Sequence, residues 1–112
     1  MIRIIFDHND HNDIISFKLM GHANSGKYGQ DIVCAAVSAL SISTVNSLFK
    51  IANIKPKVIS DDVNGGLLNV KINNCSDQLK HDRAQTLLLN LENGLVDISK
   101  NYGKYIQLKI NA

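Results

Sequence analysis

Residues 21–40 read GHANSGKYGQDIVCAAVSAL, and within them a strand pattern gives way to a helix pattern. The residues before them, 14–20, largely alternate apolar and polar side chains, as a half-buried strand does. From Asp31 to about residue 52, apolar side chains recur at threes and fours without an interrupting proline, which predicts a long helix. The stretch is therefore a strand end, a glycine-rich loop and a helix start.

The rest of the chain predicts four further strands and a second long helix. The strands are expected at residues 2–6, 57–60, 67–72 and 104–110, with a tight turn at Asn64 and Gly65. The second helix is expected from a cap at Ser76 or Asp77 to about residue 101. Gly94 within it costs about 1 kcal/mol relative to alanine, which indicates close packing against another element. The β-β-α-β-β-α-β order predicts an α+β, two-layer α/β fold with two long helices on a mixed, largely antiparallel sheet.

Length and composition indicate one globular domain over residues 1–112. The chain has 112 residues, and 45% of them are hydrophobic, which is enough for a core. Its formal net charge is only +2 and its basic residues are scattered, so we expect no direct nucleic-acid binding. The N-terminus lacks a signal-peptide pattern and no apolar run approaches the roughly 18 residues of a membrane span. We therefore expect a cytoplasmic protein with no membrane partner.

Cys34 has the position of a thiol nucleophile. If Asp31 caps the helix, Cys34 falls in its first turn, where unpaired backbone N–H groups and the helix dipole stabilise a thiolate. The same N–H groups could form an oxyanion hole for a tetrahedral intermediate. Acyl-transfer chemistry is the reaction class that this placement favours.

His22 is the histidine that can approach this helix end through the glycine-rich loop. It would take the Cys34 proton, then donate it to the leaving amine, and finally activate the water that hydrolyses the thioester. His8 and His11 belong to the first hairpin turn, and His81 belongs to the second helix. Cys34 and His22 are therefore the predicted catalytic pair.

Each of these residues also has a purely structural interpretation. A cysteine in an alanine-rich helix is by default a small core residue. Asp31 could orient His22, although capping is its simpler role, and Ser38, one turn beyond Cys34, could bond near the thiol or merely permit close packing. Three glycines could provide turns or room for a substrate backbone in a substrate loop: Gly21, Gly26 and Gly29.

The remaining reactive residues favour no further site. The turn DHNDHND at residues 7–13 contains histidine and aspartate side chains that could hold a metal, but aspartate and asparagine are also the residues that turns prefer. Cys75 has no identifiable partner, and a disulfide to Cys34 is not expected in the cytoplasm. We expect neither a metal nor a cofactor.

The stretch also resembles a known family. Its pattern is Gly-His-Ala, a short variable stretch, and then Tyr-Gly-x-Asp-Ile-Val-Cys-Ala-Ala-Val-Ser-x-Leu. This pattern is similar to that of the Prp family of bacterial ribosomal-processing cysteine proteases, and the likeness extends across the chain to the ending Tyr-Gly-Lys-Tyr-Ile from Tyr102.

The resemblance implies an α/β homodimer with a dyad of Cys34 and His22. It also implies a substrate, the short N-terminal extension of a large-subunit ribosomal protein, which is removed after an aromatic residue. The residues themselves leave two other functions open: a ribosome-assembly or peptide-binding module in which Cys34 is structural, and a thiol hydrolase for another acyl substrate.

Overall fold

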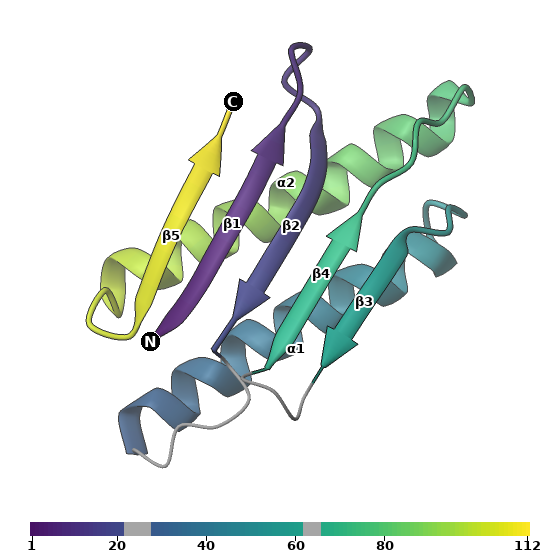
Figure 1. Ribbon diagram of the computed structural model, residues 1–112. Helices are drawn as coiled ribbons and strands as arrows, with labels where there is room; N and C mark the ends of the chain where they lie inside the picture. The colour runs from purple at the N-terminus through teal and green to yellow at the C-terminus, as the bar shows by residue number, and fades with distance from the viewer. Residues whose placement is uncertain (22–27, 62–65) are drawn as a thin grey trace.

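The computed structural model describes residues 1–21, 28–61 and 66–112, with the side chains of the first helix from Ile32 onward (Figure 1). The elements are β1 (Ile2–His8), β2 (Ile14–Met20), α1 (Tyr28–Lys50), β3 (Lys57–Asp61), β4 (Leu67–Lys71), α2 (Gln78–Asn101) and β5 (Ile106–Asn111). Their order confirms the predicted α+β fold. The turn predicted at Asn64 and Gly65 lies outside the described residues.

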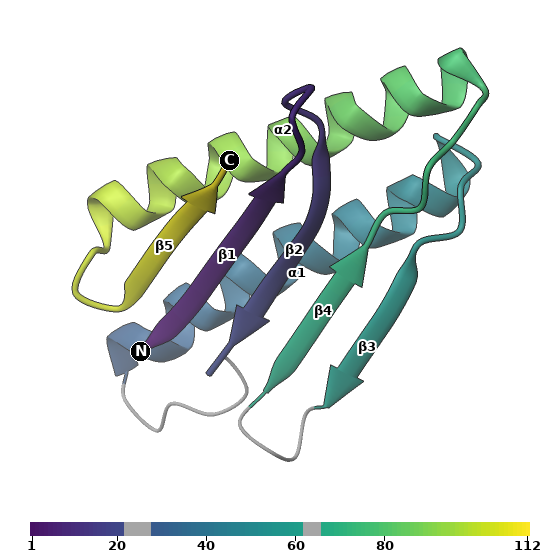
Figure 2. The same ribbon diagram turned by 45° about the horizontal axis from the view of Figure 1, so that its top comes forward.

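The five strands form one mixed sheet in the order β3-β4-β2-β1-β5. The β1–β5 pair is parallel, and the other three pairs are antiparallel. Figures 1 and 2 show both helices on the same face of the sheet, with α2 toward β5 and α1 toward β3. The fold therefore has two layers, and neither of the described helices covers the second face of the sheet.

The core lies between the sheet and the two helices. Phe6 and Phe17 pair across β1 and β2, and their ring centroids are 5.7 Å apart. These rings and the buried side chains of both helices share one cluster, to which α1 contributes Val33, Cys34, Val37 and Leu48, and α2 contributes Ala84, Leu88, Leu91 and Leu95. Burying one large apolar side chain contributes about 1.5–3 kcal/mol. This packing fixes the position of α1, which carries Cys34, on the sheet.

Polar contacts attach α2 to the β1–β2 hairpin in addition to the core. Three residue pairs make them at 2.6–3.0 Å: His8 with Glu92, Asp13 with His81, and the backbone of Ile14 with the Gln85 amide. The turn predicted at residues 7–13 is shorter than expected, because Asp7 and His8 belong to β1. His8 and Asp13, which make these contacts, both face α2. They hold the hairpin on the helix.

In contrast, α1 exposes many apolar side chains to solvent. Ile32, Ile42 and Phe49 are each more than 40% exposed, and the segment Ile32–Lys50 has a mean hydropathy of 1.8. The expectation that no apolar run approaches the length of a membrane span is therefore wrong, because by length and composition alone this 19-residue segment could cross a membrane. Core helices of globular folds pass the same test. The other face of the segment is buried on the sheet, so the exposed apolar side chains of α1 lie on the outer face.

Two details of the helices refine the predictions. Asp77 is the N-cap of α2, because its carboxylate accepts a hydrogen bond of 3.0 Å from the backbone N–H of Lys80. A Cβ built on Gly94 would lie 3.8 Å from Leu40 Cδ1, which is ordinary van der Waals contact. Gly94 does face α1, but the space there does not require a glycine.

Candidate active site

Cys34 lies on the sheet-facing side of α1. It is the seventh residue of that helix, and only 8% of its surface is exposed. It belongs to the apolar cluster that includes Val33 and Val37. The prediction that Cys34 occupies the first turn is wrong, because α1 begins at Tyr28, three residues before Asp31. The thiol therefore lies in the second turn, away from the unpaired N–H groups of the first turn. The prediction that these N–H groups form an oxyanion hole beside the thiol has lost its basis.

The same early start changes the roles of Asp31 and Gly29. Asp31 is the fourth residue of α1, so the prediction that it caps the helix is wrong, and its side chain lies outside the described residues. Gly29 is the second residue of α1 rather than a loop residue. The cost of glycine in a helix, about 1 kcal/mol, is a weak constraint that packing of a long helix overrides.

Gly21 ends the strand that leads to the predicted histidine. Its φ is +78°, and a Cβ at this position would lie 2.6 Å from the carbonyl oxygen of Met1. Its N–H donates a hydrogen bond of 3.1 Å to the carbonyl of Gly66. Only glycine fits this backbone, so steric need is a sufficient reason for Gly21. The next residue, His22, lies outside the described residues, as does Gly26.

Ser38 lies one turn beyond Cys34, and it lines a cavity of about 220 Å³ between α1 and three strands. The cavity is mainly apolar and carries no charged side chain; it is lined by Leu19, Ser38, Ile42, Val45, Val58, Ser60, Leu67 and Leu68. An uncharged apolar cavity beside a helix with a thiol suits an apolar side chain of a peptide.

The contribution of the β3–β4 hairpin to this cavity was missed from the sequence. Cross-strand partners share a face of the sheet, and the register pairs Val58 with the buried Val70, and Ser60 with Leu68. These side chains therefore face α1. The sequence predicted a strand at residues 57–60, but it did not indicate that α1 would lie opposite it.

Comparison with known sequences extends these observations to the whole chain. The sequence profile of a family described as cysteine protease Prp matches residues 1–107. A Staphylococcus aureus ribosomal processing cysteine protease Prp is 32% identical over 108 residues, which cover 96% of this chain and 97% of that one. The Bacillus subtilis protein of the same name is 30% identical, over 99% of this chain and 98% of its own.

Solved structures give the same result. A crystal structure of a Streptococcus mutans protein matches with a TM-score of 0.91 at 32% identity, over 99% of this chain and 94% of that one. S. aureus Prp in complex with a substrate peptide matches with a TM-score of 0.85 at 29% identity, over 99% of this chain and all of that one. The same protease with a covalently linked product peptide has a TM-score of 0.82 at 31% identity, with the same coverage. The chain therefore belongs to the Prp family of cysteine proteases.

Proposed function

We propose that this protein is a cysteine endopeptidase that removes the N-terminal extension of a large-subunit ribosomal protein in the cytoplasm. The observation that carries the proposal is the near full-length match to S. aureus Prp, whose structures include a substrate peptide and a covalently linked product peptide. A covalent product in that relative agrees with a nucleophilic thiol, and Cys34 lies on a helix that borders a cavity of about 220 Å³, which suits one apolar side chain of a peptide.

Cys34 and His22 carry the chemistry in this proposal. His22 takes the thiol proton, and the thiolate attacks the carbonyl carbon of the scissile peptide bond. The C–N bond then breaks, and His22 returns the proton to the departing amine. Water next attacks the thioester and releases the new carboxylate, which regenerates the thiol.

The cavity beside Ser38 supports recognition of an apolar side chain next to the scissile bond. Its walls are apolar apart from two serines, so a charged side chain would lose its hydration there without gaining an ionic partner. We infer that the aromatic residue before the cleavage site enters this cavity. Ser38 and Ser60 would then contact the peptide rather than the ring.

We also infer that the protein is a homodimer that uses the outer face of α1. Exposed apolar side chains recur there at helical spacing at Ile32, Ala39, Ile42 and Phe49, next to a groove of about 440 Å³ on the same helix. Apolar patches of this kind on globular proteins mark association surfaces. In a symmetric contact with a second copy, the outer faces of the two α1 helices would cover each other.

A peptide-cleavage assay tests the proposed chemistry. The substrate is a synthetic peptide that copies the extended N-terminus of the large-subunit protein, and mass spectrometry locates the cut. Cys34→Ser and His22→Ala are expected to abolish cleavage, while Cys75→Ser, the matched control on the chain's other cysteine, is expected to cleave at the parent rate. Cleavage by Cys34→Ser or His22→Ala at the parent rate would contradict the mechanism.

The burial of Cys34 favours one alternative, a peptide-binding module in which this cysteine is a core residue. That alternative predicts that the parent binds the peptide and leaves it intact. Alkylation by iodoacetamide near neutral pH adds an independent measurement, because a thiolate reacts faster than the buried, neutral thiol that a core residue would be.

A further inference from the structure

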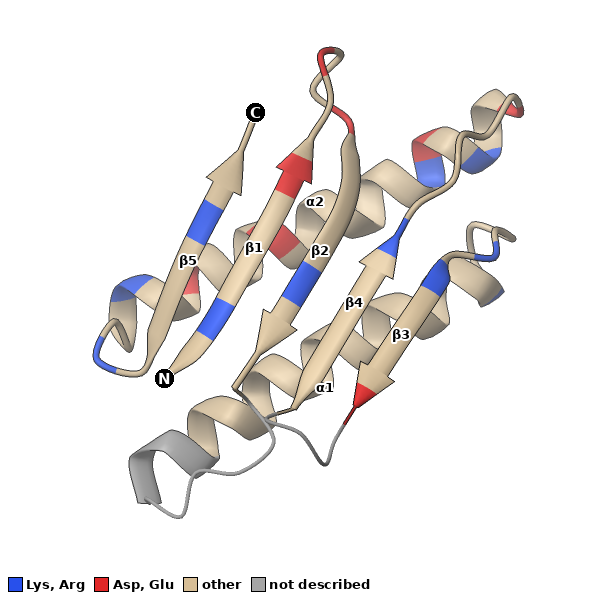
Figure 3. Ribbon diagram, in the orientation of Figure 1, with Lys and Arg blue, Asp and Glu red and all other residues tan. Residues whose placement is uncertain are grey.

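The sheet face without helices gathers basic residues that are far apart in the sequence. Each of the five strands contributes one: Arg3 from β1, Lys18 from β2, Lys57 from β3, Lys71 from β4 and Lys109 from β5. Figure 3 shows them distributed across the whole sheet. We call these five residues the basic sheet face.

The strand register places all five side chains on the same side of the sheet. Ile5 pairs with both Lys18 and Lys109, and Lys18 pairs with Asn69, so these residues form one cross-strand row. Arg3 and Lys71 lie two residues from this row on their own strands, and Lys57 pairs directly with Lys71. Residues two apart on a strand share a face. This face is opposite the core-facing row of Ile4, Leu19 and Leu68.

The charge on this face is larger than that of the whole protein. The described strands also present two carboxylates on this face, Asp7 and Asp61. Five basic and two acidic residues give the face a formal charge of +3, whereas the complete chain has +2. None of the five basic side chains forms an ion pair with another described residue. The other surfaces are therefore close to neutral on balance, and the face has a directed positive field.

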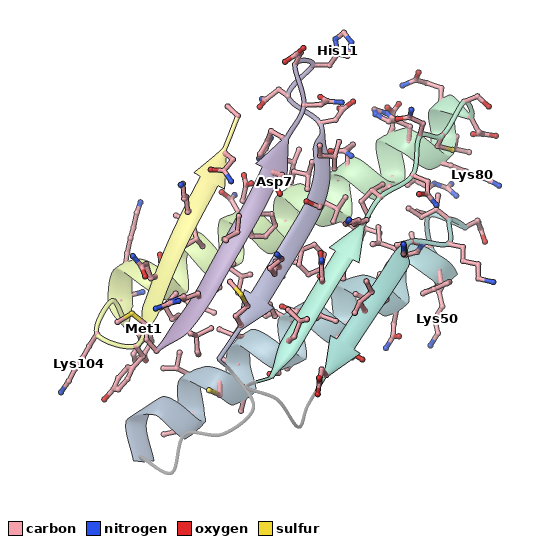
Figure 4. All side chains as sticks on the ribbon, in the orientation of Figure 1. Met1, Asp7, His11, Lys50, Lys80 and Lys104 are labelled. Carbon is pink, nitrogen blue, oxygen red and sulfur yellow. The ribbon has the colours of Figure 1, made fainter. Side chains whose placement is uncertain are left out.

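Asp7 is the main opposing charge. It lies on β1 (Figure 4) and borders a depression of about 400 Å³ that Lys18 and Lys71 also line. The Asn111 amide and the Ser16 hydroxyl each donate a hydrogen bond of 2.8 Å to its carboxylate and lower its pKa. Asp7 is thus ionised at neutral pH and repels an anion in the depression.

The composition of the face favours a double-stranded polyanion over a single-stranded one. None of the outward-facing residues on the described strands is aromatic, so the face has no platform on which unpaired bases could stack. A broad array of lysines instead suits the regularly spaced phosphates of a double helix. Helical RNA is the polyanion that surrounds ribosomal proteins.

We propose that the basic sheet face binds the phosphates of double-helical RNA and so holds the protease near its ribosomal substrate. This inference rests on the proposed function for the choice of RNA over other polyanions. It replaces the expectation of no direct nucleic-acid binding. That expectation rested on basic residues that are scattered in the sequence, whereas the fold gathers five of them on one face.

Fluorescence anisotropy with a labelled RNA hairpin of about 16 base pairs tests the proposal. The full chain is compared with K18Q/K71Q/K109Q and with a control of equal charge change, K80Q/K100Q/K104Q, on α2 and the loop after it. At about 50 mM salt, the sheet variant is expected to bind at least 10-fold more weakly than the parent, and the control less than 3-fold. The slope of log affinity against log salt should fall by about 0.9 for each phosphate that the variant no longer neutralises.

Asp7→Asn provides a gain-of-function arm, since removing the opposing charge should tighten RNA binding about 2-fold to 5-fold at the same salt. Thermal melts of every variant check that the fold is retained. Three results would overturn the proposal: no RNA binding by the parent, equal losses in the two triple variants, or equally tight binding of polyglutamate or anionic lipid vesicles by the parent.

Cleavage of the short synthetic peptide is measured in parallel to separate this inference from the proposed function. The sheet variant should cleave that peptide at the parent rate, because its three residues are on the face opposite α1. A parent that cleaves the peptide without binding RNA contradicts only this inference. A parent that binds RNA through the basic sheet face but cleaves nothing contradicts only the proposed function.

Discussion

The two helices lie on the same face of one sheet, yet they are built for different tasks. The α2 helix is mostly polar outside, and ion pairs and an amide join it to the β1–β2 hairpin. The α1 helix has no charged residue between Ile32 and Phe49, and its outer face exposes several large apolar side chains. The comparison indicates that α2 stabilises the fold, while α1 carries the thiol and the surfaces that we propose for the peptide and for a second copy.

Cys34→Ser gives the largest expected effect on α1. Because the hydroxyl is a far weaker nucleophile, peptide cleavage should fall by roughly 10⁴-fold or more, while the melting temperature stays within a few degrees. A continuous peptidase assay and a thermal melt on one preparation measure both. A loss of folding that parallels the loss of activity would contradict a catalytic role.

Leu88→Ala on α2 should give the reverse pattern. Leu88 is fully buried, and truncation leaves a cavity, so the free energy of unfolding should fall by about 2–5 kcal/mol. Urea unfolding measures the change, and the folded fraction should cleave peptide at the parent kcat. A tenfold lower kcat in fully folded protein would break the division between the helices.

Glu92→Gln tests the polar attachment of α2 through pH. Burial lowers the pKa of His8, but its hydrogen bond of 2.6 Å to Glu92 and its contact with the Asn12 carbonyl outweigh burial, so the pKa is raised. Because the pKa of His8 is higher in the folded state, protonated His8 stabilises the fold at pH values below its unfolded pKa of about 6.5. This stabilisation disappears as the pH rises through the pKa of the folded state. At about pH 5.5 the free energy of unfolding of the variant should therefore be about 1.5–3 kcal/mol lower than that of the parent, and the difference should be clearly smaller at about pH 8.5.

The matched control for this experiment is Asp97→Asn, an exposed carboxylate on the same helix. Urea titrations at both pH values should show a change of less than about 0.5 kcal/mol for it. An equal loss for Glu92→Gln at the two pH values would mean that the charge on His8 plays no part.

Phe49→Asp tests the outer face of α1 as the dimer surface. A buried charge within an apolar interface should raise the dimer dissociation constant by about 30-fold or more. Leu89→Asp, at a similarly exposed leucine of α2, is the control and should leave the assembly unchanged. Sedimentation velocity distinguishes these outcomes, and a monomeric parent would remove the dimer from the proposal.

Gly94→Ala gives the smallest expected effect. The added Cβ fits beside Leu40, and alanine favours the helix, so the free energy of unfolding should rise by about 0.5–1 kcal/mol. Differential scanning calorimetry measures the gain. A loss of stability instead would show that α1 and α2 approach more closely at Gly94 than the 3.8 Å contact indicates.

Periodicity and turn residues were sufficient to predict that every helix and strand exists, including β3, which has no buried residue. Periodicity misplaced the start of α1, since Tyr28 and Gly29 carry no periodic signal and helix formation there depends on the packing of later turns. Pattern also could not predict the strand order, which brings β1 beside β5 across a separation of about a hundred residues. The basic sheet face and the cavity beside Ser38 both follow from that order, so neither was visible in sequence.

The parallel pairing of β1 with β5 has a consequence for synthesis of the chain. Ile2 pairs with Ile106 and Asp7 with Asn111, so the first strand to leave the ribosome waits for the last one before its second edge is closed. An open strand edge invites pairing with other chains, and pairings between distant residues form slowly. Folding of this protein is therefore completed only after translation of β5, and truncations before residue 106 should yield aggregates rather than a smaller working enzyme.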